Sequence, residues 1–271
     1  MAEWGGGRFG EIGTAVLADN ASPMTLDGTN TWVLRAPDAP SSIVVDPGPP
    51  LPGHLSGIEA AAGSVGLVLL THHHLDHSEA AKDWATRWGC EVRALDPALQ
   101  LGGEGLRDGD VVGLGEVEVR VVATPGHTAD SLSFLLPSEG ALLTGDTVLG
   151  RGTTVVAHPD GRLGAYLDSL DRLHALADAH EVTTIWPGHG PVIEDALGAL
   201  DYYRAHRQER LEQIREALRT LHGLMRAGEP MEHDELPRRI VEIVYADVDP
   251  VLWGAAELSV RAQLEYLRHS A

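Results

Sequence analysis

The segment Thr71–His77, which reads Thr-His-His-His-Leu-Asp-His, constrains this chain more than any other feature. It directly follows the apolar run Gly66–Leu70, whose composition predicts a buried strand. Four potential metal ligands therefore emerge where a strand ends and a loop begins: His72, His74, Asp76 and His77. Imidazole and carboxylate groups are ligands for zinc and iron. The spacing predicts a metal site here, with His73 pointing away from its neighbours.

Three later segments repeat one pattern, in which a predicted strand ends in glycine beside a histidine or an aspartate. They present His127, Asp146 and His189. Each alone is typical of a turn, but together with the first cluster they supply enough ligands for two metal ions. Asp46 ends a further predicted strand, and the carboxylates of Asp46, Asp76 and Asp146 would repel one another without cations. We expect Asp46 to orient a ligand or a metal-bound water.

The bulk composition is that of a globular protein with an unusual excess of acid. Of 271 residues, 43% are hydrophobic, and 40 acidic against 20 basic residues give a net charge of −20. Such a charge gives no general attraction to nucleic acid or to an anionic membrane. The single cysteine, Cys90, excludes an internal disulfide. No apolar stretch approaches the ~20 residues of a membrane span and no signal peptide is visible, so we expect a cytoplasmic protein.

Strand and helix patterns alternate up to Asp195, which predicts an α/β protein with two sheets sandwiched by helices. Beyond Asp195 the pattern is helical throughout. The predicted C-terminal helices are Leu197–Met225, Glu235–Tyr245 and Pro250–Arg268. We therefore predict a catalytic domain at 1–195 and a C-terminal helical domain at 196–271.

The whole motif set resembles that of the metallo-β-lactamase superfamily, in order and in context, across about residues 14–195. Its members are Asp46, His72, His74, Asp76, His77, His127, Asp146 and His189. The resemblance implies an αββα sandwich with the site at one edge of the two sheets. The implied ligand sets are His72, His74 and His127 for one metal ion, and Asp76, His77 and His189 for a second, with Asp146 bridging both.

The implied cofactor is a pair of Zn²⁺ ions per chain, with iron and manganese as alternatives for the same ligand types. Two such ions ~3.5–4 Å apart would share a hydroxide, whose parent water has its pKa lowered from ~15.7 towards ~7. That hydroxide would attack a carbonyl or phosphoryl centre polarised by one metal ion. The other metal ion, or an acid near Asp76, would stabilise the leaving group. Asp76 and Asp46 are therefore the predicted catalytic side chains.

Single residues separate branches of the superfamily. The true β-lactamases usually carry Cys or Ser where this chain has Asp146, and flavodiiron proteins carry Glu where His74 stands. Only 42 residues separate Asp146 from His189, too few for the inserted domain of the β-CASP nucleases. Glyoxalase II-type thioesterases share the complete ligand set, so the ligands leave them as an alternative.

Four segments outside the ligands resemble the β-lactamase-like protein 2 subfamily. They are Thr25–Trp32, Gly150–Val155, Pro187–Ile193 and the motif His206-Arg207-x-x-Arg210. The resemblance implies that the C-terminal helices form a degenerate winged helix. The subfamily includes an endoribonuclease that acts on single-stranded RNA, so a phosphodiester in single-stranded RNA is the leading substrate hypothesis.

RNA binding requires a basic channel and aromatic stacking platforms. The predicted helix around Arg204–Arg226 would offer the first, and Tyr166, Tyr202 or Tyr203 the second. Alternatively, these arginines pair with glutamates on the same helix and form a solvated face. The rival hypotheses are a glyoxalase II-like thioesterase or other acyl or ester hydrolase, with at most weak β-lactamase activity, and a metal-loaded scaffold.

Asn30, His158 and Tyr166 are the predicted substrate-binding residues. For Asn30 and His158, a turn or capping role is the alternative. The partner expected is a hydrolysable substrate, either single-stranded RNA or a small ester or thioester, with no membrane. A homodimer is one option for the oligomeric state.

Overall fold

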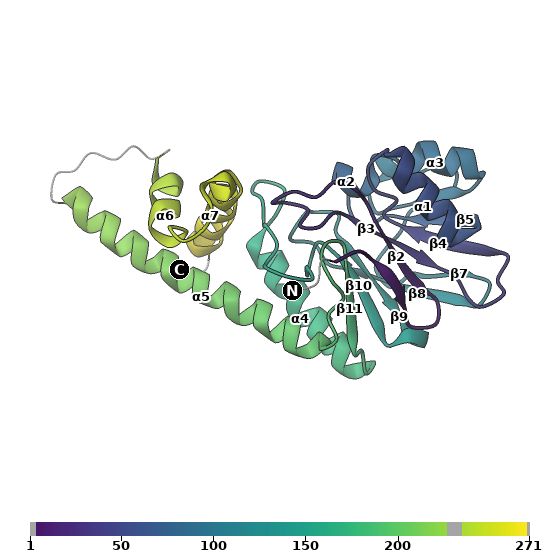
Figure 1. Cartoon of the computed structure of the whole chain (residues 1–271). Coiled ribbons are helices and arrows are strands. Elements are labelled where there is room, and N and C mark those ends of the chain that lie inside the picture. The colour runs from purple at the N-terminus through teal and green to yellow at the C-terminus, as the bar shows by residue number, and fades with distance from the viewer. Residues whose placement is uncertain (1–3, 227–234, 270–271) are drawn as a thin grey trace.

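The computed structural model describes residues 4–226 and 235–269, and it places two β-sheets face to face between helices (Figure 1). The first sheet has the order β1-β2-β3-β4-β5-β6. Its strands are β1 Gly7–Phe9, β2 Gly13–Leu17, β3 Asn30–Leu34, β4 Ser41–Val45, β5 Ser64–Leu69 and β6 Glu91–Arg93. The second sheet has the order β11-β10-β9-β8-β7. Its strands are β7 Val111–Leu114, β8 Val117–Ala123, β9 Leu132–Leu136, β10 Ala141–Gly145 and β11 Thr184–Pro187.

Helices cover both outer faces of this sandwich, which confirms the predicted αββα arrangement. Helices α1 (Pro52–Ala62) and α3 (Ala81–Trp88) pack on the first sheet, whereas α4 (Leu163–Ala179) packs on the second. Because successive side chains of a strand point to opposite faces, Trp32 and Leu34 enter the core between the sheets, while Val33 faces α1 and α3.

The sequence patterns predict eight strands, and each is present with ends shifted by no more than two residues. The predicted ranges are Thr14–Leu17, Thr31–Leu34, Ser42–Val45, Gly66–Leu70, Val117–Ala123, Ser131–Leu135, Ala141–Leu143 and Thr183–Ile185. The predictions did not include β1, β6 and β7, which are only three or four residues long. They also did not include α2 (Leu75–Ser78), a single helical turn inside the predicted metal-binding loop. That turn changes the direction of the chain between the ligands.

The two sheets bring one set of strand ends to a common edge. Strands β4 and β5 are parallel, as are β10 and β11, so the carboxyl end of each pair lies at one edge. A bridge between Thr29 and His189 joins the first sheet to the end of β11 at this edge. Asp46 follows β4, and predicted metal ligands lie in the segments that follow β5, β10 and β11.

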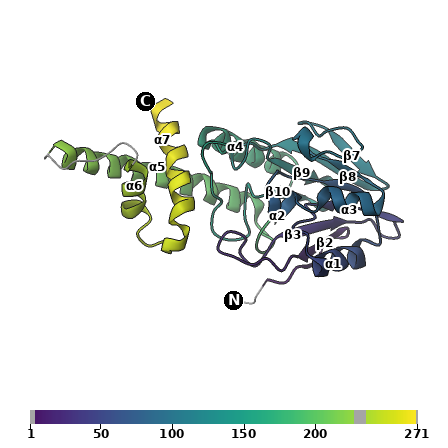
Figure 2. The ribbon, with the colours of Figure 1, turned by 90° about the horizontal axis from the view of Figure 1, so that it is seen from above.

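The C-terminal part consists of α5 (Ala196–Arg226), α6 (Leu236–Val244), a short 3-10 turn (Pro250–Leu252) and α7 (Trp253–His269). Helix α5 runs from the sandwich to the other two, and α6 and α7 lie against its far half (Figures 1 and 2). Its first half shares the apolar core beneath the second sheet, whereas its second half forms a separate core with α6 and α7. The predicted boundary at 195/196 therefore falls at the start of a helix that belongs to both cores, and it stays a prediction.

No helix in the described part of the chain has both the length and the apolar character that crossing a membrane requires.

The buried hydroxyl of Tyr203 on α5 fixes the loop that follows β10. It accepts from the N–H of Leu149 at 2.8 Å and donates to the carbonyl oxygen of Leu149 at 3.3 Å. We predict that Tyr203→Phe lowers the free energy of unfolding by about 1–3 kcal/mol, because the buried N–H of Leu149 loses its acceptor. The neighbouring Tyr202 is 56% exposed, so Tyr202→Phe is the matched control. Urea unfolding followed by circular dichroism measures both, and equal stability of the two variants would contradict this account.

Candidate metal centre

The first ligand set consists of three histidines from two separate segments. His72 directly follows Thr71 at the end of β5, His74 precedes α2, and His127 follows β8. The Nδ1 atom of His74 lies 3.1 Å from Nε2 of His72 and 3.0 Å from Nε2 of His127. All three nitrogens lie within 4.8 Å of one another, which is the geometry of a three-histidine metal site.

The second ligand set adjoins the first and contains a carboxylate. The Nε2 atoms of His77 and His189 lie 3.2 Å apart. The Oδ2 atom of Asp76 lies 3.2 Å from Nε2 of His189 and 3.5 Å from Nε2 of His77. The helical turn α2 brings Asp76 and His77 to this side, while His189 arrives from the end of β11.

Asp146, which follows β10, lies between the two sets. Its Oδ1 is 3.4 Å from Nε2 of His77. Its Oδ2 is 3.3 Å from Nε2 of His189 and 3.7 Å from Nε2 of His127. The Oδ1 atom is buried and accepts no hydrogen bond from the described residues. One carboxylate therefore faces both sets with an unused lone pair, as a bridging ligand requires.

Hydrogen bonds to the outer nitrogens fix the tautomers of the ligands. Nδ1 of His127 lies 2.7 Å from the carbonyl oxygen of Val155, and Nδ1 of His189 lies 3.1 Å from that of Gly28. A carbonyl oxygen only accepts, so each Nδ1 carries the hydrogen and each Nε2 directs a lone pair inward. This is how histidine is presented to a metal ion.

Asp46 sets the tautomer of one histidine in each set. It accepts from the N–H of Thr71 at 2.8 Å and from its hydroxyl at 2.6 Å, and Nδ1 of His77 lies 2.9 Å from Oδ2. Since the only hydroxyl hydrogen of Thr71 goes to Asp46, the hydroxyl oxygen must accept from Nδ1 of His72, at 2.9 Å. Both histidines therefore present Nε2 lone pairs.

Asp46, His72 and His77 are also close enough to form a third ligand group. However, the Nδ1 of His77 carries a hydrogen that it donates to Asp46, and the carboxylate already has three donors. We therefore propose that Asp46, which is buried, positions the ligands, and its predicted catalytic role stays a prediction. Its backbone has φ 51°, a left-handed conformation that non-glycine residues adopt at a cost.

The residues fit a metal ion in both sets. Nitrogens with inward lone pairs at 3.0–3.2 Å from one another repel unless a cation or a proton lies between them. A tetrahedral ion at about 2.0–2.1 Å from each nitrogen would hold such pairs about 3.3 Å apart. Burial, together with neighbouring histidines, lowers the pKa of His72, His74 and His127, so the first set consists of neutral ligands.

In the second set, neighbouring carboxylates raise the pKa of a histidine instead of leaving it lowered. Burial lowers the pKa of His189, but Asp146 and Asp76 outweigh burial and raise it to about 9. For Asp76, burial raises the pKa, but the hydrogen bond with His189 and the charge of His77 lower it to about 2. Asp76 is therefore a carboxylate suited to binding a cation rather than a proton donor.

His73 lies outside both sets. Its side chain is 41% exposed, and Nδ1 lies 2.8 Å from Oδ1 of Asp130.

The three predicted substrate contacts have other partners within the structure, and their role in substrate binding stays a prediction. Asn30 is buried and donates from Nδ2 to the carbonyl oxygens of Pro187 and Gly190, so it holds the turn that carries His189. Tyr166 is fully buried and donates to the carbonyl oxygen of Thr147 at 2.7 Å. His158 faces Glu265 on α7 at 3.4 Å, away from the metal centre.

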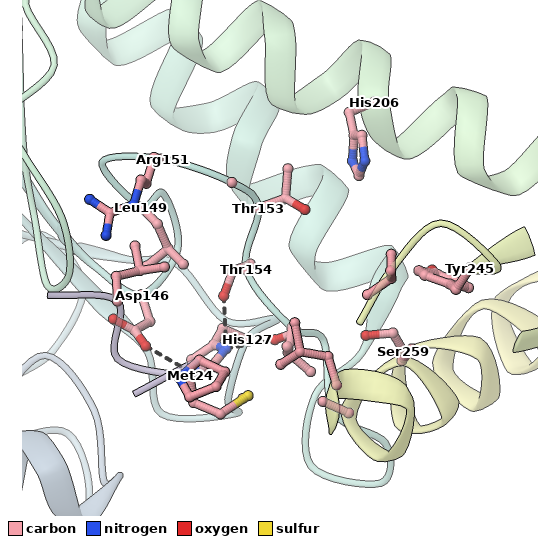
Figure 3. Close-up of a pocket in the computed structure, with 18 of the residues that line it drawn as sticks. Met24, His127, Asp146, Leu149, Arg151, Thr153, Thr154, His206, Tyr245 and Ser259 are labelled. Atoms are coloured by element: carbon pink, nitrogen blue, oxygen red, sulfur yellow. Dashed lines mark hydrogen bonds and ion pairs between the residues drawn. The ribbon is translucent and has the colours of Figure 1, made fainter. Parts of the chain in front are cut away.

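A cavity of about 350 Å³ opens beside His127 and Asp146 (Figure 3). Apolar side chains supply much of its wall, including Met24, Leu26, Leu149, Val248, Leu252 and Ala256. Helix α5 contributes His206, Arg207 and Arg210. The sequence predictions did not include this cavity, although the motif His206-Arg207-x-x-Arg210 was already conspicuous in the sequence.

Comparison with known proteins agrees with this site. The sequence profile of the metallo-beta-lactamase superfamily matches residues 24–189, and that of the beta-lactamase associated winged helix domain matches residues 237–269. A beta-lactamase-like protein 2 homolog of Caenorhabditis elegans is 31% identical over 273 residues, which cover 96% of this chain and 85% of that protein.

Two further relatives extend the comparison. The lactamase-like protein nscB of Aspergillus fumigatus is 36% identical over 204 residues, or 73% of this chain, and the match spans only 59% of that relative. The crystal structure of a beta-lactamase domain protein from Burkholderia ambifaria superposes with a TM-score of 0.78 at 25% identity, covering 98% of this chain and 89% of that one.

The fold and the histidine and aspartate clusters thus define a metal-dependent hydrolase. The chain belongs to the metallo-β-lactamase superfamily, and it carries the associated winged-helix domain as helices α6 and α7. The predicted family and fold class are confirmed. Within the described part of residues 196–269 there is no strand, in agreement with a degenerate, helical form of that domain.

We predict that Asp46→Asn weakens metal binding by about 10–100-fold, although Asp46 touches no metal position. An amide offers only one accepting oxygen, so either Thr71 or His77 loses its acceptor and one ligand loses its tautomer. The control is Asp130→Asn, whose carboxylate contacts His73 outside both sets. Competition with a chromogenic chelator measures the affinity. Wild-type affinity in Asp46→Asn would disprove the positioning role.

Proposed function

We propose that this protein is a dinuclear zinc hydrolase of small esters or thioesters. The observation that carries the proposal is the cavity of about 350 Å³ that opens at His127 and Asp146. His127 belongs to the first ligand set, and Asp146 is the predicted bridging ligand. A cavity of this size and apolar lining suits a compact acyl group, and small-molecule sites typically combine apolar walls with a few polar groups.

Two zinc ions, when bound, would supply Lewis acidity and lower the pKa of a water molecule towards neutrality. The chain supplies the rest of the machinery. His72, His74 and His127 would hold one ion as neutral ligands, while Asp76, His77 and His189 would hold the other. The loop after β10, held by Tyr203, keeps Leu149 against the acyl group, and the apolar wall limits the entry of bulk water.

The hydrolysis of single-stranded RNA is the second candidate, because a two-metal centre also suits a phosphodiester. The surface of α5 gives it less support than the sequence suggested. Arg204 pairs with Asp171 at 2.6 Å, Arg215 pairs with Glu212 at 3.2 Å, and Arg219 pairs with Glu216. These arginines are thus neutralised on the solvated face, and they do not form the basic channel that RNA requires.

A parallel assay of the zinc-loaded protein tests the proposal. We expect thioesters and 4-nitrophenyl esters of short-chain acids to be hydrolysed, with kcat/KM of about 10⁴ M⁻¹ s⁻¹ or more for the best of them. Chelation should abolish this activity and added zinc should restore it. The same preparation is offered a fluorescent single-stranded RNA and a β-lactam. Efficient cleavage of the RNA without turnover of any ester would contradict the proposal.

A further inference from the structure

Two arginines at the cavity, one buried and one half-buried, have no counter-ion among the described residues. Arg207 is 4% exposed and donates from Nη2 to the carbonyl oxygen of Thr154 at 2.6 Å, while its buried Nε–H has no acceptor among the residues that the structure describes. Arg210 donates from Nη1 to Val244 O at 2.8 Å and to Gln213 Oε1 at 3.0 Å. Among the described residues, neither guanidinium forms an ion pair with a carboxylate.

Other arginines nearby do form ion pairs with carboxylates. Arg151 lines the same cavity and pairs with Asp27. Along α5, Arg204, Arg215 and Arg219 each pair with a carboxylate. In a chain with 40 acidic residues, counter-ions are abundant. Burying an unpaired charge is costly, so a pair of uncompensated guanidinium groups in one cavity indicates a binding role.

His206 is the second residue of this wall, after Arg207, with a buried polar atom that lacks a hydrogen-bond partner among the described residues. Its ring projects from α5 across the cavity from Asp146 and His127 (Figure 3). Its Nδ1 is buried and has no hydrogen-bond partner in the described structure. Burial, followed by the charges of Arg207 and Arg210, lowers the pKa of His206 to about 4, so the ring is neutral and able to donate one hydrogen bond.

Aromatic rings hold both guanidinium groups in place without neutralising them. The Arg207 guanidinium lies 5.0 Å from the centroid of the Tyr166 ring, and that of Arg210 lies 4.6 Å from the centroid of Tyr245. Contact with a ring face stabilises a guanidinium group while leaving in-plane N–H groups available. The two tyrosine rings therefore hold the guanidinium groups in position while N–H groups stay available to a hydrogen-bond acceptor.

We propose that Arg207, Arg210 and His206 form an oxyanion subsite, which binds a carboxylate or phosphate on the acyl portion of the substrate. The inference rests on the proposed ester or thioester hydrolysis and names its substrate class, namely esters of acids that carry a second anionic group. Guanidinium groups bind such oxyanions through paired, charge-assisted hydrogen bonds. Leu149, Val248 and Leu252 would cover the hydrocarbon chain between the subsite and the scissile bond.

The first experiment compares substrates that differ only in this charge. The zinc-loaded protein is assayed with mono(4-nitrophenyl) esters of dicarboxylic acids from succinate to suberate, and with the same esters capped as methyl esters. A parallel series ends in phosphonate, which distinguishes a phosphate from a carboxylate. At the best chain length we expect kcat/KM to favour the anionic ester by about tenfold or more, which is the factor that one charge-assisted hydrogen bond provides.

Variants then assign this preference to the arginines. In Arg210→Gln the ratio of kcat/KM for the anionic and capped esters should fall towards one. Arg207→Lys keeps the positive charge but loses the planar guanidinium group that donates paired hydrogen bonds. We expect its ratio to lie between that of the wild type and one. Arg219→Gln, which removes a paired arginine from the solvated face of α5, should keep the wild-type ratio. Thermal unfolding of each variant verifies that it is folded.

A binding measurement separates this inference from the proposed function. The non-hydrolysable monoamide of each dicarboxylic acid is titrated calorimetrically into the zinc-loaded wild type and Arg210→Gln. If no ester is hydrolysed but the monoamide binds in a manner that requires Arg210, the proposed function fails and the subsite stands. If esters are hydrolysed with no anionic preference, or with one that Arg210→Gln leaves unchanged, the subsite is disproved. If no ester is hydrolysed and no monoamide binds, both the proposed function and the oxyanion subsite are disproved.

Discussion

The carboxylate of Asp46 is the interaction on which the site depends. It accepts directly from His77, a ligand of the second set, and through the Thr71 hydroxyl it fixes His72, a ligand of the first. One buried side chain thus sets the tautomer of a histidine on each side of Asp146. Because a histidine with the wrong nitrogen protonated cannot bind a cation, both ligand sets require this contact. The left-handed backbone at Asp46 is a strain that the surrounding hydrogen bonds maintain.

The sandwich delivers the ligands because two pairs of parallel strands end at the same edge. Polar contacts then join the sheets there: Asn30 holds the turn after β11, and Gly28 accepts from His189. Helix α5 extends this arrangement to the cavity. Its first half belongs to the core of the sandwich, so the side chains of Arg207 and Arg210 take a fixed position beside the metal centre.

The histidine and aspartate clusters could be predicted because their members lie in segments that follow strand ends, and strand patterns are local. Strands β1, β6 and β7 were not predicted, because three or four residues are too few to show the alternation of apolar and polar side chains. The burial of single side chains also could not be predicted from the sequence. Tyr166 and Asn30 have the chemistry of substrate contacts, but the packing of distant segments encloses both. The cavity brings Leu26, His127 and Tyr245 together from three distant regions. Such long-range packing is not visible in any local pattern.

Anomalous X-ray diffraction from zinc-loaded crystals, measured on both sides of the zinc edge, tests the central claim most directly. Two peaks about 3.5–4 Å apart are expected. Asp146 should lie between them, with His74 coordinating through Nδ1 and His77 through Nε2, and Asp46 should contact neither ion. A single peak, or a zinc ion coordinated by Asp46, would contradict the assignment of the ligand sets.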